Sequence, residues 1–198
     1  MAEGRFKVPE HLAVRVPAAA MRASVEDLFV ANGMPAADAK QAADVLIWAD
    51  LRGIDSHGVS NMMAFYIQGL KDGNINPAPE WKATVDFGAI ANIDSDRGLG
   101  LVVGPPAMRL AIHKARQFGV GCVVAGNGRH FGAAGYHAAM ALEHGMVGMA
   151  MTVGGPARQF GERASDLGRG ELRRHGNLAW ASHRYPCVDR ARGYYGKR

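Results

Sequence analysis

Apolar residues recur at helical spacing in three segments of the first 70 residues, at about 17–32, 36–51 and 60–70. A proline opens the first segment and a glycine follows it, which are typical helix limits. The apolar positions of the first two segments are Val25, Leu28, Phe29, Ala39, Ala42, Ala43, Val45, Leu46 and Ala49. We expect a helical module that ends near Asp72 and is preceded by a short strand at residues 14–16.

The third segment carries large apolar side chains on one side, namely Met62, Met63, Phe65, Tyr66 and Leu70. Such a stripe could face a cofactor, but packing against a hydrophobic core is its commoner role. We therefore interpret these side chains as core residues.

After Trp81 the pattern changes to strands that alternate with helices. Two runs at 81–87 and 89–94 flank Gly88 and predict a β-hairpin. The elements expected next are an amphipathic helix at 105–118, a strand at 120–125, a helix at 133–144 and a strand at 146–152. Strand, helix and strand at this spacing predict a βαβ unit with a parallel pair. The fold class is therefore α/β.

The formal net charge of +5 comes from the end of the chain. Up to residue 156 there are 13 basic and 14 acidic residues, whereas residues 157–198 hold 10 basic and 4 acidic residues. A basic terminal segment can bind polyanions. Because its basic residues form no helical stripe and are not interleaved with aromatic residues, we do not expect nucleic-acid binding.

The remaining composition is that of an ordinary globular protein, with 48% hydrophobic residues. No apolar run approaches the roughly 20 residues needed to cross a bilayer. The first residues lack the apolar core of a signal peptide. Cys122 and Cys187 are too few for a disulfide framework or a metal cluster. We expect a cytoplasmic protein that does not contact membranes.

Residues 52–58 (RGIDSHG) follow the second helical segment and concentrate groups suited to proton transfer. His57 has the side-chain pKa nearest neutrality, and Asp55 or Ser56 could orient its ring. Two interpretations stay open on the residues alone: a catalytic turn, or a polar turn in which Asp55 or Ser56 caps the next helix. A serine-hydrolase site is disfavoured, because neighbouring residues rarely form a triad and no G-x-S-x-G turn is present.

His130 lies where a predicted strand passes to a helix, in a loop with glycines at 126, 128 and 132. Helix N-termini at this place in α/β proteins bind anionic ligands. The glycine spacing is not G-x-G-x-x-G and no partner acid follows at the expected distance, so a Rossmann site is not supported. The alternative role of His130 is that of a loop histidine that caps the helix.

His130, His137 and His144 recur every seven residues. A zinc site would favour a pair four residues apart with a carboxylate or cysteine nearby. The sequence offers no such set, so we expect no bound metal.

Four stretches together resemble the type 2 malate/L-lactate dehydrogenase family, and their order and spacing along the chain match those of the family. They are residues 52–59 (RGIDSHGV), 96–100 (DRGLG), 114–124 (KARQFGVGCVV) and 130–136 (HFGAAGY). The resemblance extends from about residue 14 to residue 156. It implies a non-Rossmann α/β fold in which a helical N-terminal part precedes a mixed α/β nucleotide-binding part, here incomplete.

That family comprises NAD(P)-dependent enzymes that pass a hydride between a nicotinamide and carbon 2 of a 2-oxo or 2-hydroxy acid. The resemblance implies NAD or NADP as cofactor, a malate- or lactate-like substrate and a homodimer. It implies that His57 carries the proton with Ser56 orienting it, while His130 either lies at the nicotinamide or is itself the acid–base residue. The residues implied to line the cofactor are His130, Phe131, Gly132, Ala133, Ala134 and Asp189.

Asn61 departs from the family pattern, in which many members place an arginine five residues after the serine to hold the substrate carboxylate. A neutral amide cannot make the bidentate, charge-assisted contact of a guanidinium group. We therefore expect a weaker or different acid as substrate.

We divide the chain into a helical region at 1–78 with the catalytic turn, an α/β cofactor-binding region at 79–156 and a basic tail at 157–198. The tail lacks apolar periodicity, and we expect it to be largely irregular. Two pieces, 173–181 (RRHGNLAWA) and 186–191 (PCVDRA), look like distorted remnants of stretches that relatives carry, and Asp189 would match the acid of the second. A disturbed reading frame or a fragmentary gene would explain this.

A shortened chain would leave a parallel strand edge unpaired after residue 152. Unpaired edges favour aggregation, so we expect a marginally stable and nearly inactive chain. The alternative to an oxidoreductase is a non-enzymatic, truncated family member that serves subunit association, with polyanion binding by the tail as a further possibility.

Overall fold

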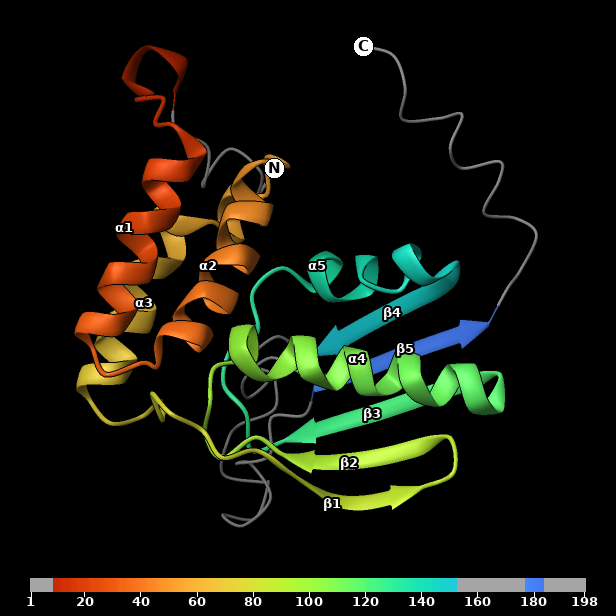
Figure 1. Cartoon of the computed structure of the whole chain (residues 1–198). Coiled ribbons are helices and arrows are strands. Elements are labelled where there is room, and N and C mark those ends of the chain that lie inside the picture. The colour runs from red at the N-terminus through yellow and green to blue at the C-terminus, as the bar shows by residue number, and fades with distance from the viewer. Residues whose placement is uncertain (1–8, 153–176, 184–198) are drawn as a thin grey trace, which may run out of the picture.

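The computed structural model describes residues 9–152 and 177–183. Three helices form a module on one side, and a five-stranded sheet with helices across one of its faces forms the other side (Figure 1). This arrangement confirms the expected fold class, a helical N-terminal part followed by a mixed α/β part. The division into regions at 78 and 156 stays a prediction.

The helical module consists of α1 (Ala18–Ala31), α2 (Ala36–Asp50) and α3 (Val59–Lys71). These are the three helices that the apolar spacing predicts. The short side chains of α2 allow its neighbours to pack closely, and its buried residues are Ala39, Ala42, Ala43, Val45, Leu46, Ile47 and Ala49. The strand predicted at 14–16 is wrong, because these residues form no strand and are exposed; only a 3-10 turn, Glu10–Leu12, precedes α1.

The sheet has the order β1-β2-β3-β5-β4. Its strands are β1 (Lys82–Phe87), β2 (Ile90–Asp94), β3 (Val120–Gly126), β4 (Met146–Thr152) and β5 (Asn177–His183). β1 and β2 form the predicted antiparallel hairpin around Gly88. β2 runs parallel to β3, whereas β5 is antiparallel to both β3 and β4.

Strand β5 corrects two predictions. β3 and β4 do not pair with each other, because β5 lies between them; the adjacent parallel pair is β2 and β3, which α4 (Gly100–Phe118) connects. The tail is also not wholly irregular, since residues 177–183 pair along both β3 and β4 and so occupy the edge that we expected to stay open. The rest of the tail, with Asp189, lies outside the described residues.

Helices α4 and α5 (Ala134–Ala139) cover the same face of the sheet (Figure 1). Gly121 on β3 and Gly148 on β4 both pair with position 181, so they lie in one row across the sheet. A Cβ at Gly121 would overlap the carbonyl oxygen of Ala111 in α4, and one at Gly148 would overlap that of Ala138 in α5. Glycine is required in this row because the helix backbones lie directly on the strands.

Both later helices differ in length from their predicted extents. α4 begins at Gly100 and carries Pro105 and Pro106 inside, whereas the sequence predicts a start at the first of these prolines. α5 ends at Ala139, and a separate 3-10 turn, Leu142–His144, leads to β4. Helix boundaries are less sharply encoded than helix cores, because several residues near an end satisfy the same pattern.

The core has two parts. One joins α1, α2 and α3 to the start of α4, where Leu99, Leu101 and Val102 are buried among the helices. The other lies between α4 and the sheet, with Met108, Val123 and other buried residues. Because α4 contributes to both parts, it links the helical module to the sheet.

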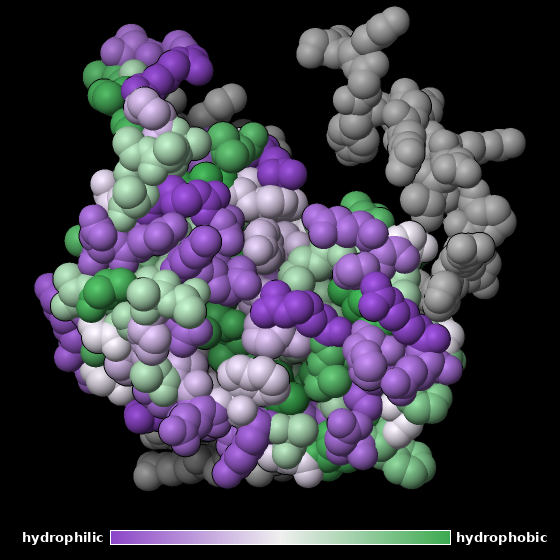
Figure 2. Space-filling view, in the orientation of Figure 1, coloured by the Kyte–Doolittle hydropathy of each residue, from purple (hydrophilic) through white to green (hydrophobic). Residues whose placement is uncertain are grey.

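The other face of the sheet is apolar and exposed in the structure. Ile90, Val124, Met149 and Met151 are 51%, 37%, 46% and 47% exposed, and Val124 lies between the buried residues Val123 and Ala125. The helix-covered side in Figure 2 mixes hydrophilic and apolar residues on its surface. No helix among the described residues has the length and apolar character needed to cross a membrane.

Substitutions of two neighbouring valines on β3 test the difference between the covered and the exposed face of the sheet. Val123 faces the helices and is 0% exposed, whereas Val124 faces away. We expect Val123→Lys to unfold the chain, because an unpaired buried ammonium costs several kcal/mol. Val124→Lys should keep the melting temperature near that of the parent and reduce aggregation and the binding of a hydrophobic dye. Equal loss of stability in both variants, measured by circular dichroism, would contradict the assignment of the faces.

Candidate active site

The predicted catalytic turn is a single 3-10 turn, Asp55–His57, between α2 and α3. Its exit is fixed from outside the turn: the carboxylate of Asp50, at the end of α2, accepts the backbone N–H of Val59 at 3.1 Å. Burial raises the pKa of the Asp50 carboxyl. Asp50 therefore caps α3, and the interpretation in which Asp55 or Ser56 does so is wrong.

At Gly58 a larger residue would displace the Asp50 carboxylate that caps α3. A Cβ there would overlap Oδ1 of Asp50 and lie 2.7 Å from its Cγ. The Asp50 carboxylate therefore both caps α3 and packs against the backbone of the turn. Asn61 secures the turn from α3, because its Nδ2 donates to the carbonyl oxygen of Asp55 at 2.7 Å.

Ser56 and His57 are in direct contact within this turn. The Ser56 hydroxyl and His57 Nδ1 form a hydrogen bond of 2.8 Å. Both side chains are half-buried. Ser56 therefore orients the imidazole of His57 through one ring nitrogen and leaves Nε2 on the opposite side of the ring.

The second histidine lies in the loop after β3, at the carboxyl end of a strand that is parallel to its neighbour. Backbone hydrogen bonds join this loop to the one after β2: Arg97 N–H donates to the Asn127 carbonyl at 2.9 Å and Arg129 N–H to the Gly98 carbonyl at 3.0 Å. Gly100 N–H donates to the carbonyl of His130 at 3.1 Å. His130 is thus held against the N-terminus of α4 rather than placed in a free loop.

Helix α2 brings the two histidine-bearing segments together. Val45 of α2 packs closely on Gly132: a Cβ built on this glycine would lie 2.9 Å from Cγ1 of Val45. The rings of Trp48 and Tyr136 meet edge to face, with centroids 5.8 Å apart. Gln41 Nε2 donates to the Tyr136 hydroxyl at 3.0 Å. The helix that ends at the catalytic turn therefore also packs against the loop of His130.

His57 and His130 consequently stack, with ring centroids 5.5 Å apart and planes inclined by 18°. Phe65 lies edge-on to the His130 ring at 6.2 Å and is 58% exposed. Two imidazoles from separate parts of the sequence thus share one site beside an exposed aromatic ring.

Tyr66 is the buried residue of the site and contacts His130 from the helical core. Its side chain is 0% exposed, and its hydroxyl and His130 Nδ1 form a hydrogen bond of 2.8 Å. Burial raises the pKa of the Tyr66 hydroxyl, so it stays protonated. Burial and the neighbouring His57 lower the pKa of His130 to about 4. At neutral pH His130 is therefore an uncharged imidazole.

The residues after His130 are mostly buried. Phe131 is 4% exposed and stacks on His137 at 4.8 Å, and Ala133 is also 4% exposed, while Ala134 is half-buried. Gly132 has a φ of 73°. The side chains of Phe131 and Ala133 are buried in the core, so of the side chains in residues 131–134 that of Ala134 stays partly accessible to a cofactor.

His137, on α5, supports this loop through a hydrogen bond to its backbone. It is 1% exposed, and its Nε2 donates to the carbonyl of Phe131 at 2.7 Å. Burial lowers the pKa of His137 to about 4, against a smaller rise from that hydrogen bond. His144 instead contacts Arg116 at 2.9 Å. Within the described ranges, no three side chains of His, Cys, Asp or Glu come together as metal ligands.

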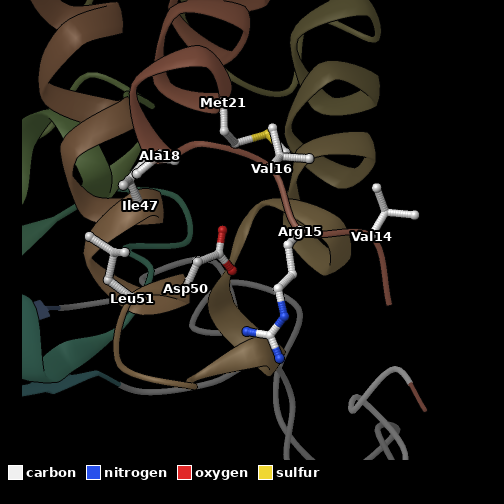
Figure 3. Close-up of a pocket in the computed structure, with 8 residues that line it drawn as sticks. All are labelled: Val14, Arg15, Val16, Ala18, Met21, Ile47, Asp50 and Leu51. Carbon is white, nitrogen blue, oxygen red and sulfur yellow. The ribbon is translucent and has the colours of Figure 1, made fainter. Parts of the chain in front are cut away.

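A separate cavity of about 320 Å³ lies on the other side of Asp50 (Figure 3). It is lined by Val14, Arg15, Val16, Ala18, Met21, Ile47, Asp50 and Leu51. Neither histidine of the site reaches it. Its one link to the site is the Asp50 carboxylate, which also caps α3.

The sequence places His57, Ser56 and His130 in the site, and the structure brings these three together. It misses Tyr66 and Asp50. Tyr66 belongs to the apolar stripe that we assign to the core, and nothing in that pattern distinguishes a hydroxyl with a partner from a packed ring. Asp50 precedes Val59 by nine residues, farther than the local spacing of an ordinary cap.

The fold and the paired histidines define a class, an α/β protein with two stacked histidines between a helical module and a strand-to-helix loop. The family model described as malate/L-lactate dehydrogenase matches residues 16–160. The chain belongs to this family.

Two relatives show how far the likeness extends. The chain is 43% identical over 139 residues to malate dehydrogenase of Pyrococcus horikoshii, which covers 70% of this chain and 38% of that protein. It is 46% identical over 143 residues to L-sulfolactate dehydrogenase of Methanocaldococcus jannaschii, covering 72% and 41%. The solved structure of the Pyrococcus horikoshii enzyme superposes with a TM-score of 0.72 at 42% identity, over 76% of this chain and 42% of that one. The match thus spans about two fifths of the length of these relatives.

The buried histidines make stability depend on pH. An unfolded chain protonates histidine near pH 6.5, whereas His137 in the folded chain stays neutral down to about pH 4. Between these values the unfolded state binds more protons, so the free energy of unfolding falls as the pH falls, by up to about 1.4 kcal/mol per pH unit for one such group. His130, which is less buried, adds a smaller loss in the same direction.

Urea unfolding at pH 7 and pH 5 measures this loss. His137→Gln should reduce the difference between the two pH values, although it lowers stability at pH 7. His113→Gln, a change on the exposed side of α4, should leave the difference unchanged. If the free energy of unfolding of His137→Gln fell between pH 7 and pH 5 by as much as that of the parent, His137 would not be the cause of the pH dependence.

Proposed function

We propose that this chain carries the acid–base part of a nicotinamide-dependent oxidoreductase site for small 2-hydroxy and 2-oxo acids. The stacked pair of His57 and a neutral His130 is the observation that carries the proposal. Family membership supports it, as do the names of the relatives, which are malate and sulfolactate dehydrogenases. Those names do not favour the alternative of a non-enzymatic chain for subunit association.

His57 is the proton carrier in this proposal. Its Nδ1 is oriented by Ser56, and an imidazole held through one nitrogen presents the other to a substrate hydroxyl. In oxidation of a hydroxy acid, Nε2 of His57 takes the proton of the 2-hydroxyl group as carbon 2 loses its hydride. In reduction the same nitrogen returns the proton to the oxygen. A histidine in this role typically accelerates a reaction by about 10²- to 10⁴-fold.

His130 serves as a neutral hydrogen-bond donor and not as the acid. A group with a pKa of about 4 carries almost no proton to donate as an acid at neutral pH. Its N–H can polarise a carbonyl oxygen without changing charge. The proposal thus assigns the acid–base role to His57 and not to His130.

A nicotinamide, when bound, supplies the hydride acceptor or donor. The residues present fit a flat ring in two respects: the aromatic side chain of Phe65 is exposed beside His130, and Gly126, Gly128 and Gly132 in the loop carry no side chain that would block a close approach. The proposal covers both NAD and NADP. From the resemblance it also includes a homodimeric, cytoplasmic protein.

The substrate carboxylate must be held by a group other than Asn61. The amide of this residue already donates to the Asp55 carbonyl at 2.7 Å. Asn61 thus acts as a brace for the turn where many family members have an arginine. We propose that Asn61→Arg would strengthen binding of the acid, at the cost of that brace.

Activity is tested by following nicotinamide absorbance with malate, L-lactate or sulfolactate and either NAD or NADP. His57→Gln should lower kcat by about 10²- to 10⁴-fold, because the proton carrier is lost. His113→Gln, a change far from the site, is the matched control and should keep parent activity. If the parent turns over and His57→Gln keeps the same kcat, His57 is not the proton carrier.

A further inference from the structure

Two hydrogen-bond donors converge on a single nitrogen of His130. The Tyr66 hydroxyl lies 2.8 Å from Nδ1, and the backbone N–H of Gly132 donates to the same atom at 3.3 Å. A backbone N–H can only donate, so Nδ1 must offer a lone pair. The tyrosine must then donate as well, and the ring proton of neutral His130 must reside on Nε2.

We propose that Tyr66 is a positioning residue that, as the shorter of two donors to Nδ1 and together with the Gly132 N–H, sets the tautomer of His130, holding its only N–H on Nε2 and its acceptor nitrogen toward the core. Its use in catalysis rests on the proposed function, but the tautomer itself is a property of this chain. The nitrogen that reaches a ligand is then always a donor. A neutral imidazole without such a partner would exchange between two tautomers.

Packing alone does not account for the hydroxyl of Tyr66. The ring lies between Phe29, at 6.4 Å, and Phe65, at 5.7 Å, and belongs to the helical core. A phenylalanine would fill the same space, whereas a buried hydroxyl without a partner is costly. The hydrogen bond that the structure gives this hydroxyl is the one to His130.

The surroundings of His130 reinforce the neutral form. Protonation of Nδ1 would place an N–H against the N–H of Gly132. The titratable groups that face the ring among the described residues are His57, stacked on it, and Tyr66 beneath it. Neither supplies a negative charge, since the Tyr66 hydroxyl stays protonated, and the lowered pKa of His130 agrees with this.

The test is a long-range proton–nitrogen correlation spectrum of the full chain labelled with ¹⁵N-histidine, at pH 7. His130→Gln identifies the His130 signals by their loss. In the parent, Nδ1 should show the shift of an unprotonated ring nitrogen and Nε2 that of a protonated one. Tyr66→Phe should move both shifts part of the way toward the average of the two tautomers, because only the longer contact from the Gly132 N–H then remains on Nδ1.

Tyr136→Phe is the matched control. It removes another half-buried hydroxyl, one that is bonded to Gln41 and not to His130, and should leave the His130 shifts unchanged. A protonated Nδ1 in the parent would overturn the proposal even if Tyr66→Phe failed to fold. So would a folded Tyr66→Phe variant with parent-like His130 shifts.

The spectrum needs no turnover, so its outcome is separate from that of the proposed function. Parent shifts as expected, with no oxidation of any of the acids tested, would remove the proposed function and keep the tautomer assignment. Where the parent is active, Tyr66→Phe should lower kcat more than it changes KM for the nicotinamide.

Discussion

The site depends on the contact between helix α2 and the loop that follows β3. Val45 lies against Gly132 and Trp48 against Tyr136, and an aromatic pair of this kind contributes about 0.5–1.5 kcal/mol beyond its buried area. α2 ends at the turn of His57, so this contact sets the distance between two histidines from separate parts of the chain. If α2 shifted along the loop, the imidazoles would no longer stack, although each segment could keep its own backbone structure.

The same burial that holds the loop also sets its electrostatics. Removal from water lowers the pKa of both His130 and His137 to about 4. Each neutral ring has a hydrogen-bonding role: His137 donates to the Phe131 carbonyl, and His130 accepts on one nitrogen while it donates from the other. Of these two roles, that of His130 requires a neutral ring, because a protonated Nδ1 could not accept. Stability is lost at acid pH because His130 and His137 are uncharged in the folded chain and become protonated on unfolding.

Local patterns predict much of this molecule, and long-range pairing accounts for what they miss. The helical spacing finds α1, α2 and α3, and the runs around Gly88 find the hairpin, because these elements are encoded within a few residues. The insertion of β5 between β3 and β4 is a matter of register across distant segments, which no window of sequence contains. His57 and His130 stand out by residue type. Tyr66 does not, since a core tyrosine and a tyrosine that orients a histidine have the same helical spacing.

The contact of the two imidazole rings is the central claim, and nuclear Overhauser effects between their ring protons test it most directly. The stacked arrangement, with centroids 5.5 Å apart, predicts cross-peaks between carbon-bound ring protons of His57 and His130 in the chain without ligand. Weakening the contact of α2 with the loop by Trp48→Ala should reduce them while far-UV dichroism keeps its helical signal. Well-resolved histidine signals with no such cross-peaks in the parent would contradict the account, because the two residues would then not share a site.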